Sequence, residues 1–127
     1  MIRSHAEIEA VTLPGIVHRT LAGSQEGLKG MEVWMQTIAP GAETPMHSHD
    51  CEEVVVVLQG SGFCELEGEM HTFAAGSTLI VPRGAVHRIV NNGPTEMLAV
   101  ASLSTAPVIV QAPDGSRIPL PWDAPSS

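Results

Sequence analysis

Hydrophobic and polar residues alternate in short runs along this chain, with the period of two that is typical of β-strands. In the segment 31–39, one face carries Glu32, Trp34, Gln36 and Ile38. Turn-forming residues such as Pro40-Gly41 separate the runs, and no segment keeps helical spacing for more than one turn. The pattern therefore predicts an all-β sandwich or barrel, with strands in the segments 16–21, 31–39, 53–59, 63–67, 70–73, 77–81, 86–90, 96–103 and 107–111.

One of these runs differs from the others because it is apolar on both faces. The segment 53–59 contains the uninterrupted sequence Val54-Val55-Val56-Val57-Leu58. β-Branched residues favour strands, and a strand without polar positions is typical of burial between two layers. We therefore expect both faces of this strand to be covered.

Composition and charge narrow the class of protein. The chain has 127 residues with 6 Lys and Arg against 14 Asp and Glu, a formal net charge of −8. This length predicts one domain, and the negative charge argues against nucleic acid and anionic membranes as partners. No apolar run approaches the roughly 20 residues of a membrane span. Residues 1–10 are charged and lack an apolar signal-peptide core, so we expect a cytoplasmic protein.

The two cysteines do not suggest a disulfide. If residues 59–62 form a hairpin turn, Cys51 lies roughly 20 Å along the partner strand from the position opposite Cys64, at about 3.3 Å per residue. A disulfide needs Cα atoms within about 7 Å of each other. We expect two buried, reduced thiols.

Three histidines and one glutamate form the strongest chemical pattern in the sequence. His47 and His49 are two residues apart, so in an extended segment they point to the same side. Glu53 has the same parity, and His87 opens a later strand. Imidazole nitrogens with a carboxylate oxygen form a ligand set for zinc, manganese, iron, cobalt and nickel. On spacing alone, surface or buried structural histidines remain an equal alternative. His5 and His71 are expected to be solvated, and nothing favours a special role for His18.

The segments around these residues resemble two sequence motifs of the cupin superfamily. Residues 41–60 read G-x5-H-x-H-x3-E-x6-G, and residues 76–91 read G-x5-P-x-G-x2-H-x3-N. This resemblance implies a double-stranded β-helix, the cupin jelly-roll barrel. It also implies a divalent metal ion held by His47, His49, Glu53 and His87, with zinc as the first expectation and manganese, nickel, iron or cobalt as alternatives. We expect an N-terminal extension with a dimer-forming strand at 1–30, the barrel at 31–111 and a Pro-rich tail packed on the barrel at 112–127.

A longer stretch resembles the plant auxin-binding protein family within the cupins. The shared order is Glu32-Val33-Trp34, Gln36-Thr37, Pro40-Gly41, Thr44-Pro45, the histidine pair and Cys51-Glu52-Glu53-Val54, with Leu120-Pro121-Trp122-Asp123 near the end. This resemblance implies that the protein binds an arylacetic acid as its ligand. The carboxylate of this ligand would bind the metal, and its ring would occupy an apolar pocket. The matching pocket residues are Trp34, Gln36, Thr44, Pro45 and Trp122, although core packing alone would also explain both tryptophans. Leu120 replaces a family phenylalanine, and the segment between the motifs is shorter, so the ligand need not be auxin.

The sequence leaves a binding module and an enzyme as alternatives. A small (aryl) carboxylate bound at an open metal position is the first hypothesis, and a metal-dependent dioxygenase, isomerase or lyase is the second. Arg88 is out of phase with His87 and should point away from the metal, and no catalytic residue is identified. A metal that only stiffens the barrel is a third hypothesis. We also expect a homodimer in which the segment 16–21 adds to the partner's sheet.

Overall fold

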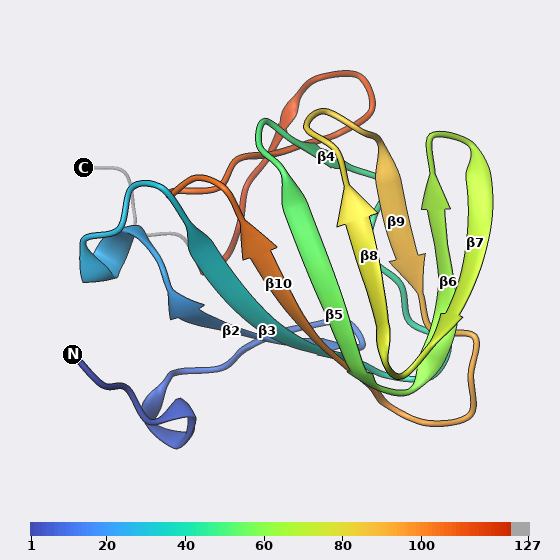
Figure 1. Cartoon of the computed structure of the whole chain (residues 1–127), viewed down its shortest axis with the longest axis horizontal. Coiled ribbons are helices and arrows are strands. Elements are labelled where there is room, and N and C mark those ends of the chain that lie inside the picture. Colours follow the sequence, from blue (N-terminus) through green and yellow to red (C-terminus); the bar gives the residue numbers. More distant parts are fainter. Residues whose placement is uncertain (123–127) are drawn as a thin grey trace.

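The computed structural model describes residues 1–122, and it is built almost entirely of antiparallel strands (Figure 1). A six-stranded sheet has the order β1-β2-β3-β10-β5-β8, and two three-stranded sheets have the orders β7-β6-β9 and β12-β11-β4. The strands are β1 (Val11–Leu13), β2 (Ile16–Ala22), β3 (Glu32–Ile38), β4 (Ser48–His49), β5 (Glu53–Gln59), β6 (Ser61–Leu66), β7 (Glu69–Ala74), β8 (Ser77–Val81), β9 (His87–Val90), β10 (Met97–Leu103), β11 (Val110–Gln111) and β12 (Arg117–Ile118). Two short 3-10 turns, His5–Glu7 and Ser24–Glu26, complete the described elements.

The predicted all-β jelly roll is confirmed, and the alternation of residues explains it. In β3, Trp34 and Ile38 are buried while Val33 and Met35, which alternate with them, are only partly covered. The same alternation recurs in β10, so that the two strands pair through seven residues each and present one apolar face to the core. The sequence pattern did not predict β1, β4 and β12. These strands have only two or three residues, too few to show an alternation of hydrophobic and polar positions.

The core lies inside the barrel, between the concave face of the large sheet and the two smaller sheets. Val57, Met97 and Leu103 are almost completely buried there. Gly62 in β6 lets the strands approach closely, because a Cβ at this position would overlap the carbonyl oxygen of Val90 and lie 2.8 Å from Cε of Met97. The opposed sheets leave a cavity between them, and this cavity is the candidate site.

The outer face of the large sheet is more exposed than the sequence suggested. The prediction that β5 is covered on both sides is wrong: Val55 and Val57 face the core, but Val54 and Val56 are each 39% exposed and Leu58 is 50% exposed. The reason is that no described segment packs on the convex side of this sheet. Ile80 of the neighbouring β8 is 70% exposed on the same side.

The two cysteines are buried and free, as predicted. Burial raises the pKa of the Cys64 thiol to about 11, and burial is also the main reason that the pKa of Cys51 is raised. Both therefore remain protonated thiols within the core near neutral pH.

The chain before and after the barrel motifs packs on the barrel. β2 pairs with β1 on one edge and with β3 on the other, so both of its edges are paired within this chain. Ile118, Leu120 and Trp122 of the tail pack against the core, whereas residues 123–127 of the predicted tail lie outside the described residues. None of the helices in residues 1–122 has the length or apolar character needed to cross a membrane.

Candidate metal centre

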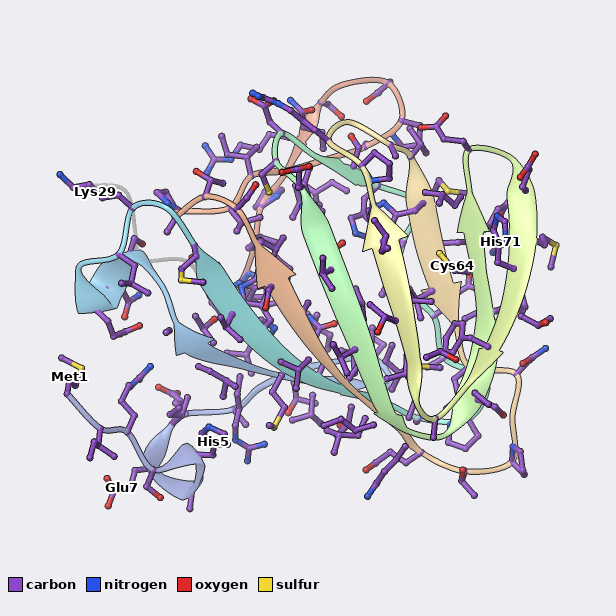
Figure 2. The ribbon with its side chains drawn as sticks, viewed as in Figure 1. Met1, His5, Glu7, Lys29, Cys64 and His71 are labelled. Carbon is purple, nitrogen blue, oxygen red and sulfur yellow. The ribbon has the colours of Figure 1, made fainter. Side chains whose placement is uncertain are left out.

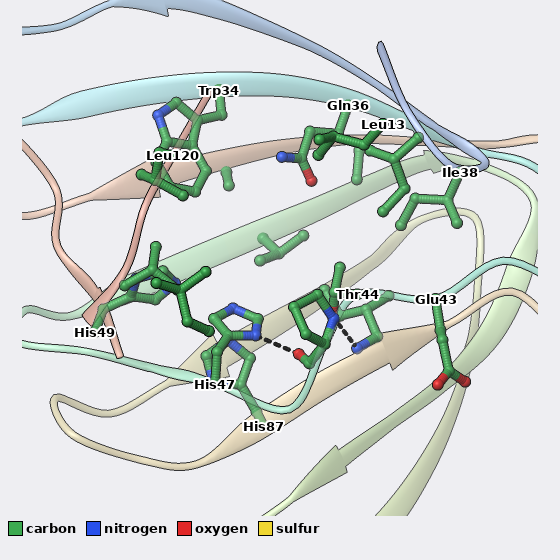
Figure 3. Close-up of a pocket in the computed structure, with 18 of the residues that line it drawn as sticks. Leu13, Trp34, Gln36, Ile38, Glu43, Thr44, His47, His49, His87 and Leu120 are labelled. Carbon is green, nitrogen blue, oxygen red and sulfur yellow. Dashed lines mark hydrogen bonds between the residues drawn. The ribbon is translucent and has the colours of Figure 1, made fainter. Parts of the chain in front are cut away.

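Three histidines from both sequence motifs meet at one end of the cavity (Figure 3). His49 lies at the end of β4, and His87 opens β9. His47 and His87 exchange two backbone hydrogen bonds, of 2.9 Å and 2.8 Å, so residues 40 positions apart are neighbours in an antiparallel bridge. One ligand nitrogen from each of His47, His49 and His87 lies within 4.8 Å of the others.

Backbone carbonyls hold each imidazole by its Nδ1 atom. His47 Nδ1 lies 2.6 Å from Pro45 O, His87 Nδ1 lies 2.9 Å from Ala85 O and His49 Nδ1 lies 3.2 Å from Ile109 O. Since a carbonyl only accepts, each Nδ1 carries the proton, and in the neutral form of each ring the Nε2 lone pair is left available. His49 Nε2 is buried and has no hydrogen-bond partner among the described residues. Buried lone pairs that converge without a donor are the chemistry that a metal cation satisfies.

Glu53 supplies a carboxylate beside these nitrogens. Its side chain is buried at the start of β5, and its Oε1 atom lies 3.1 Å from His87 Nε2 and 3.6 Å from His49 Nε2. Burial opposes ionisation of Glu53, but the hydrogen bond from His87 and the electrostatic interactions with the three histidines more than compensate, so its pKa is lowered. An ionised Glu53 therefore accepts a hydrogen bond from His87 Nε2, and His87 would release this proton on binding a metal ion. Among the described residues, the group of side chains close enough to share one ion contains the three histidines and not Glu53, so Glu53 as fourth ligand stays a prediction.

The ionisation of the histidines also suits a cation. Burial, with a contribution from nearby His87, lowers the pKa of His47 to about 4, and burial lowers the pKa of His49. Burial alone would lower the pKa of His87 too, but its hydrogen bond to Glu53 raises it. Two of the three imidazoles are therefore neutral near pH 7, which is the form that binds metal.

A cavity of about 490 Å³ opens from this cluster. All five residues predicted to form a ligand pocket line it: Trp34, Gln36, Thr44, Pro45 and Trp122. Most of the remaining wall is apolar, and Leu13, Ile118 and Leu120 belong to it although the sequence did not single out the first two. No lysine or arginine is among the described residues that line this cavity. Arg88 points away from it, as predicted, and pairs with Glu65 at 2.7 Å and Glu43 at 3.2 Å.

The two tryptophans stand at the histidine end of the cavity. The indole nitrogen of Trp34 donates to Glu32 Oε2 at 2.6 Å, and its ring meets His49 edge-on with centroids 5.9 Å apart. Trp122 meets Trp34 edge-on at 5.3 Å between centroids. The rings thus form an aromatic wall next to the histidine cluster, with the orientation of Trp34 fixed by a buried hydrogen bond.

Sequence reasoning missed His18, which is fully buried beside this wall. Its ring stacks on Trp122 with centroids 3.5 Å apart and an angle of 13°, and its Nδ1 atom lies 2.9 Å from Nε2 of Gln36. Alternation with the buried Ile16 in the same strand is the signal that could have placed it inside. By contrast, His5 and His71 are exposed, as predicted (Figure 2).

Comparison with known proteins agrees with this arrangement. The family model described as "Auxin binding protein" matches residues 3–120. Auxin-binding protein 1 of Arabidopsis thaliana is 40% identical over 105 residues, which cover 75% of this chain and 53% of that protein. The chain thus spans about half the length of the curated relatives it matches.

Solved structures share the fold. An RmlC-like cupin from Shewanella frigidimarina matches with a TM-score of 0.72 and 21% identity over 83% of this chain and 90% of that one. The polyketide cyclase RemF from Streptomyces resistomycificus matches with a TM-score of 0.71 and 25% identity over 97% of this chain and 89% of that one. The cupin barrel, the histidine cluster and the matched family model lead to one conclusion: this chain belongs to the auxin-binding protein family of cupins.

Proposed function

We propose that this protein binds a small carboxylic acid at a divalent metal ion in the barrel. The observation that carries the proposal is the contrast within the cavity: apolar walls, three convergent histidines, and no lysine or arginine among the described lining residues. A carboxylate buried among apolar side chains needs a cationic partner. His47, His49, Glu53 and His87 would hold a metal ion that supplies this positive charge.

Zinc is the metal we propose first. Three imidazole nitrogens and one carboxylate oxygen suit zinc, and also suit manganese, nickel, iron and cobalt. A fixed orientation of each imidazole through its Nδ1–H keeps the Nε2 atoms directed at the ion. The described residues that line the cavity include only two carboxylates, Glu53 and Glu43. Glu43 pairs with Arg88, so Glu53 is the one carboxylate left to neutralise a metal ion. The complex of a divalent cation with one carboxylate would therefore attract a second, ligand carboxylate.

An aromatic group is the ligand body that best fits the rest of the cavity. Trp34 and Trp122 offer ring faces and edges, and Leu13, Ile38 and Ile118 offer aliphatic surface. A cavity of about 490 Å³ lies within the usual size range of small-molecule sites. We therefore propose a small arylacetic-type acid, with Gln36 and Thr44 as the polar groups that orient it.

Calorimetric titration with phenylacetate and 1-naphthaleneacetate tests this proposal. Zinc-loaded protein should bind at least one of these acids with micromolar affinity, and binding should disappear after chelation. The neutral analogue 2-phenylethanol is the control, because it retains the ring and lacks the carboxylate. Equal affinity for acid and alcohol, or binding that survives chelation, would contradict a carboxylate held by metal.

An enzyme that acts on a small aromatic molecule is the second candidate. The similarity to the polyketide cyclase RemF, which extends over 97% of this chain, is the observation that favours it. Against it, the cavity offers no free acid or base apart from the metal-binding set and Glu43 among its described lining residues. Turnover of an aromatic polyketide or oxygen uptake with a bound aryl acid would favour the enzyme.

We also propose that two copies associate through the outer face of the large sheet. Both edges of β2 are paired within the chain, so this face is a better candidate than strand addition by residues 16–21. Its four strands β3, β10, β5 and β8 span roughly 450 Å² at about 4.8 Å between strands, which is the size of one side of a weak, transient interface. Ile80→Glu should give monomers by light scattering, while Met70→Glu on β7 should not. A wild-type mass of one 13.4 kDa chain would contradict the dimer.

A further inference from the structure

The fully buried His18 belongs to a hydrogen-bonded chain that ends in the cavity. Its Nδ1 atom lies 2.9 Å from Nε2 of Gln36, and its Nε2 atom lies 2.7 Å from Oγ1 of Thr20. The pairing of β2 with β3 sets His18 directly opposite Gln36, so the contact follows from the register of the sheet. His18 does not line the metal-side cavity itself, whereas Gln36 does.

The hydrogen bonds define which nitrogen of His18 carries the proton. An amide nitrogen only donates, so the Nδ1 atom of His18 must accept from Gln36. In a neutral imidazole the other nitrogen then carries the proton, and Nε2–H donates to Thr20. Burial lowers the pKa of His18 to about 3, which keeps the ring neutral at physiological pH and agrees with this arrangement.

The same contact sets the orientation of the Gln36 amide. With its nitrogen held by His18, the carbonyl oxygen Oε1 points into the cavity, on the opposite side from the metal-binding histidines (Figure 3). No hydrogen bond to this oxygen occurs among the described residues. The cavity therefore presents a hydrogen-bond acceptor, and not a donor, at the position of Gln36.

We infer that His18 is a positioning residue that makes the pocket selective for aryl carboxylates bearing a ring N–H or O–H group. This inference rests on the proposed function and adds the ligand's second polar group to it. The metal would take the carboxylate, and Oε1 of Gln36 would accept from the ring donor. A ligand without that donor leaves the oxygen without a partner, and an isostere that places an oxygen there meets repulsion.

The same imidazole supports the aromatic wall. It stacks on Trp122 with centroids 3.5 Å apart and meets Trp34 edge-on at 5.2 Å. A phenylalanine at position 18 retains a flat ring for these contacts but has no acceptor for Gln36. His18→Phe therefore separates the polar role of the residue from its packing role.

The first test needs no ligand. Long-range proton–nitrogen NMR spectra of zinc-loaded, ¹⁵N-labelled protein distinguish the two neutral tautomers of histidine, and His18→Phe assigns the signal. We expect a protonated Nε2 and an unprotonated Nδ1 at His18. A protonated Nδ1 would overturn the inference, because Gln36 would then present its NH₂ group to the cavity. This result is independent of whether the proposed function is correct.

The second test compares indole-3-acetate with 1-benzofuran-3-acetate, which replaces the ring N–H by oxygen. We expect the zinc-loaded wild type to prefer the indole about 10-fold, the range of one hydrogen bond. His18→Phe should reduce this ratio towards one and leave zinc content unchanged. In a Gln36→Leu background, His18→Phe should not alter the ratio further, since its effect passes through Gln36.

The outcomes separate the two proposals. Equal wild-type affinity for both acids, or a preference that survives His18→Phe, would refute the role of His18 while the metal–carboxylate proposal stands. An additive loss of the preference in the double variant would show that His18 does not act through Gln36. Absence of binding by either acid, together with the expected tautomer, would instead refute the proposed function.

Discussion

Replacing His49 by alanine tests the candidate metal centre most directly. The Nε2 atom of His49 is buried and has no hydrogen-bond partner among the described residues. Coordination of a metal ion would explain this buried, unpartnered nitrogen. His71 provides the matched control, because its side chain is 54% exposed on β7. The variants His49→Ala and His71→Ala each remove one imidazole, but only the first removes a proposed ligand.

The number of ligands sets the expected magnitude. Four-ligand zinc sites bind with about 10–16 kcal/mol, so one ligand contributes about 3 kcal/mol, or ~100-fold in affinity. At saturating zinc a 100-fold weaker site loses about 2.7 kcal/mol of metal-dependent stabilisation. For 127 residues, at about 2.1 cal/mol/K of unfolding entropy per residue, this loss lowers Tm by about 10 °C.

The assay is the rise in Tm on adding zinc to chelated protein, with metal content measured by mass spectrometry after dialysis. Using the rise, rather than Tm itself, removes the effect of the space left by the His49 ring. Wild type and His71→Ala should show the same rise and one zinc per chain. If His49→Ala shows an undiminished rise and full zinc content, His49 is not a ligand and the site must be reassigned.

Three further results are expected. Trp34→Ala should weaken binding of an aryl carboxylate about 10-fold or more by calorimetry without reducing zinc content; unchanged affinity would exclude this wall. Gly62→Ala should lower stability in urea by several kcal/mol because its Cβ would overlap Val90 O, whereas Gly30→Ala, with open space around it, should be nearly neutral. His18 in the unfolded chain binds a proton below about pH 6.5, whereas the folded residue, with its pKa of about 3, does not. The free energy of unfolding of the chelated protein should therefore fall by about 2 kcal/mol between pH 7 and 5. His18→Phe should abolish this part of the pH dependence, and an equal pH dependence in both proteins would refute the neutral, buried ring.

The strands and the placement of His47 and His49 on one side could be predicted from the sequence because both follow from local spacing. A two-residue period determines that Trp34, Gln36 and Ile38 share a face, whichever strands lie beside them. His47 and His49 follow the same rule. Their approach to His87 did not follow from spacing; it came from the resemblance to cupin motifs, and only the fold shows the backbone bridge that joins His47 to His87.

Other features depend on which elements pack together, and local pattern does not contain that information. Val54 and Val56 read as buried because valine favours strands on either face, yet the convex side of the sheet has no covering layer in residues 1–122. His18 appeared unremarkable because its partners Gln36 and Trp122 lie 18 and 104 positions away. Leu13 and Ile118 reach the cavity through strands too short to show a period.

The backbone bridge between His47 and His87 has a consequence for how a metal site arises in this barrel. Two of the proposed ligands, from separate motifs, are held in register by reciprocal hydrogen bonds without an ion, so little conformational entropy would remain to be lost on coordination. With such preorganisation, folding of the chain alone forms the candidate metal centre, and metal binding is not needed to assemble it. Loading and exchange would then follow the metals available to the cell and their intrinsic order of affinity, with the barrel persisting throughout.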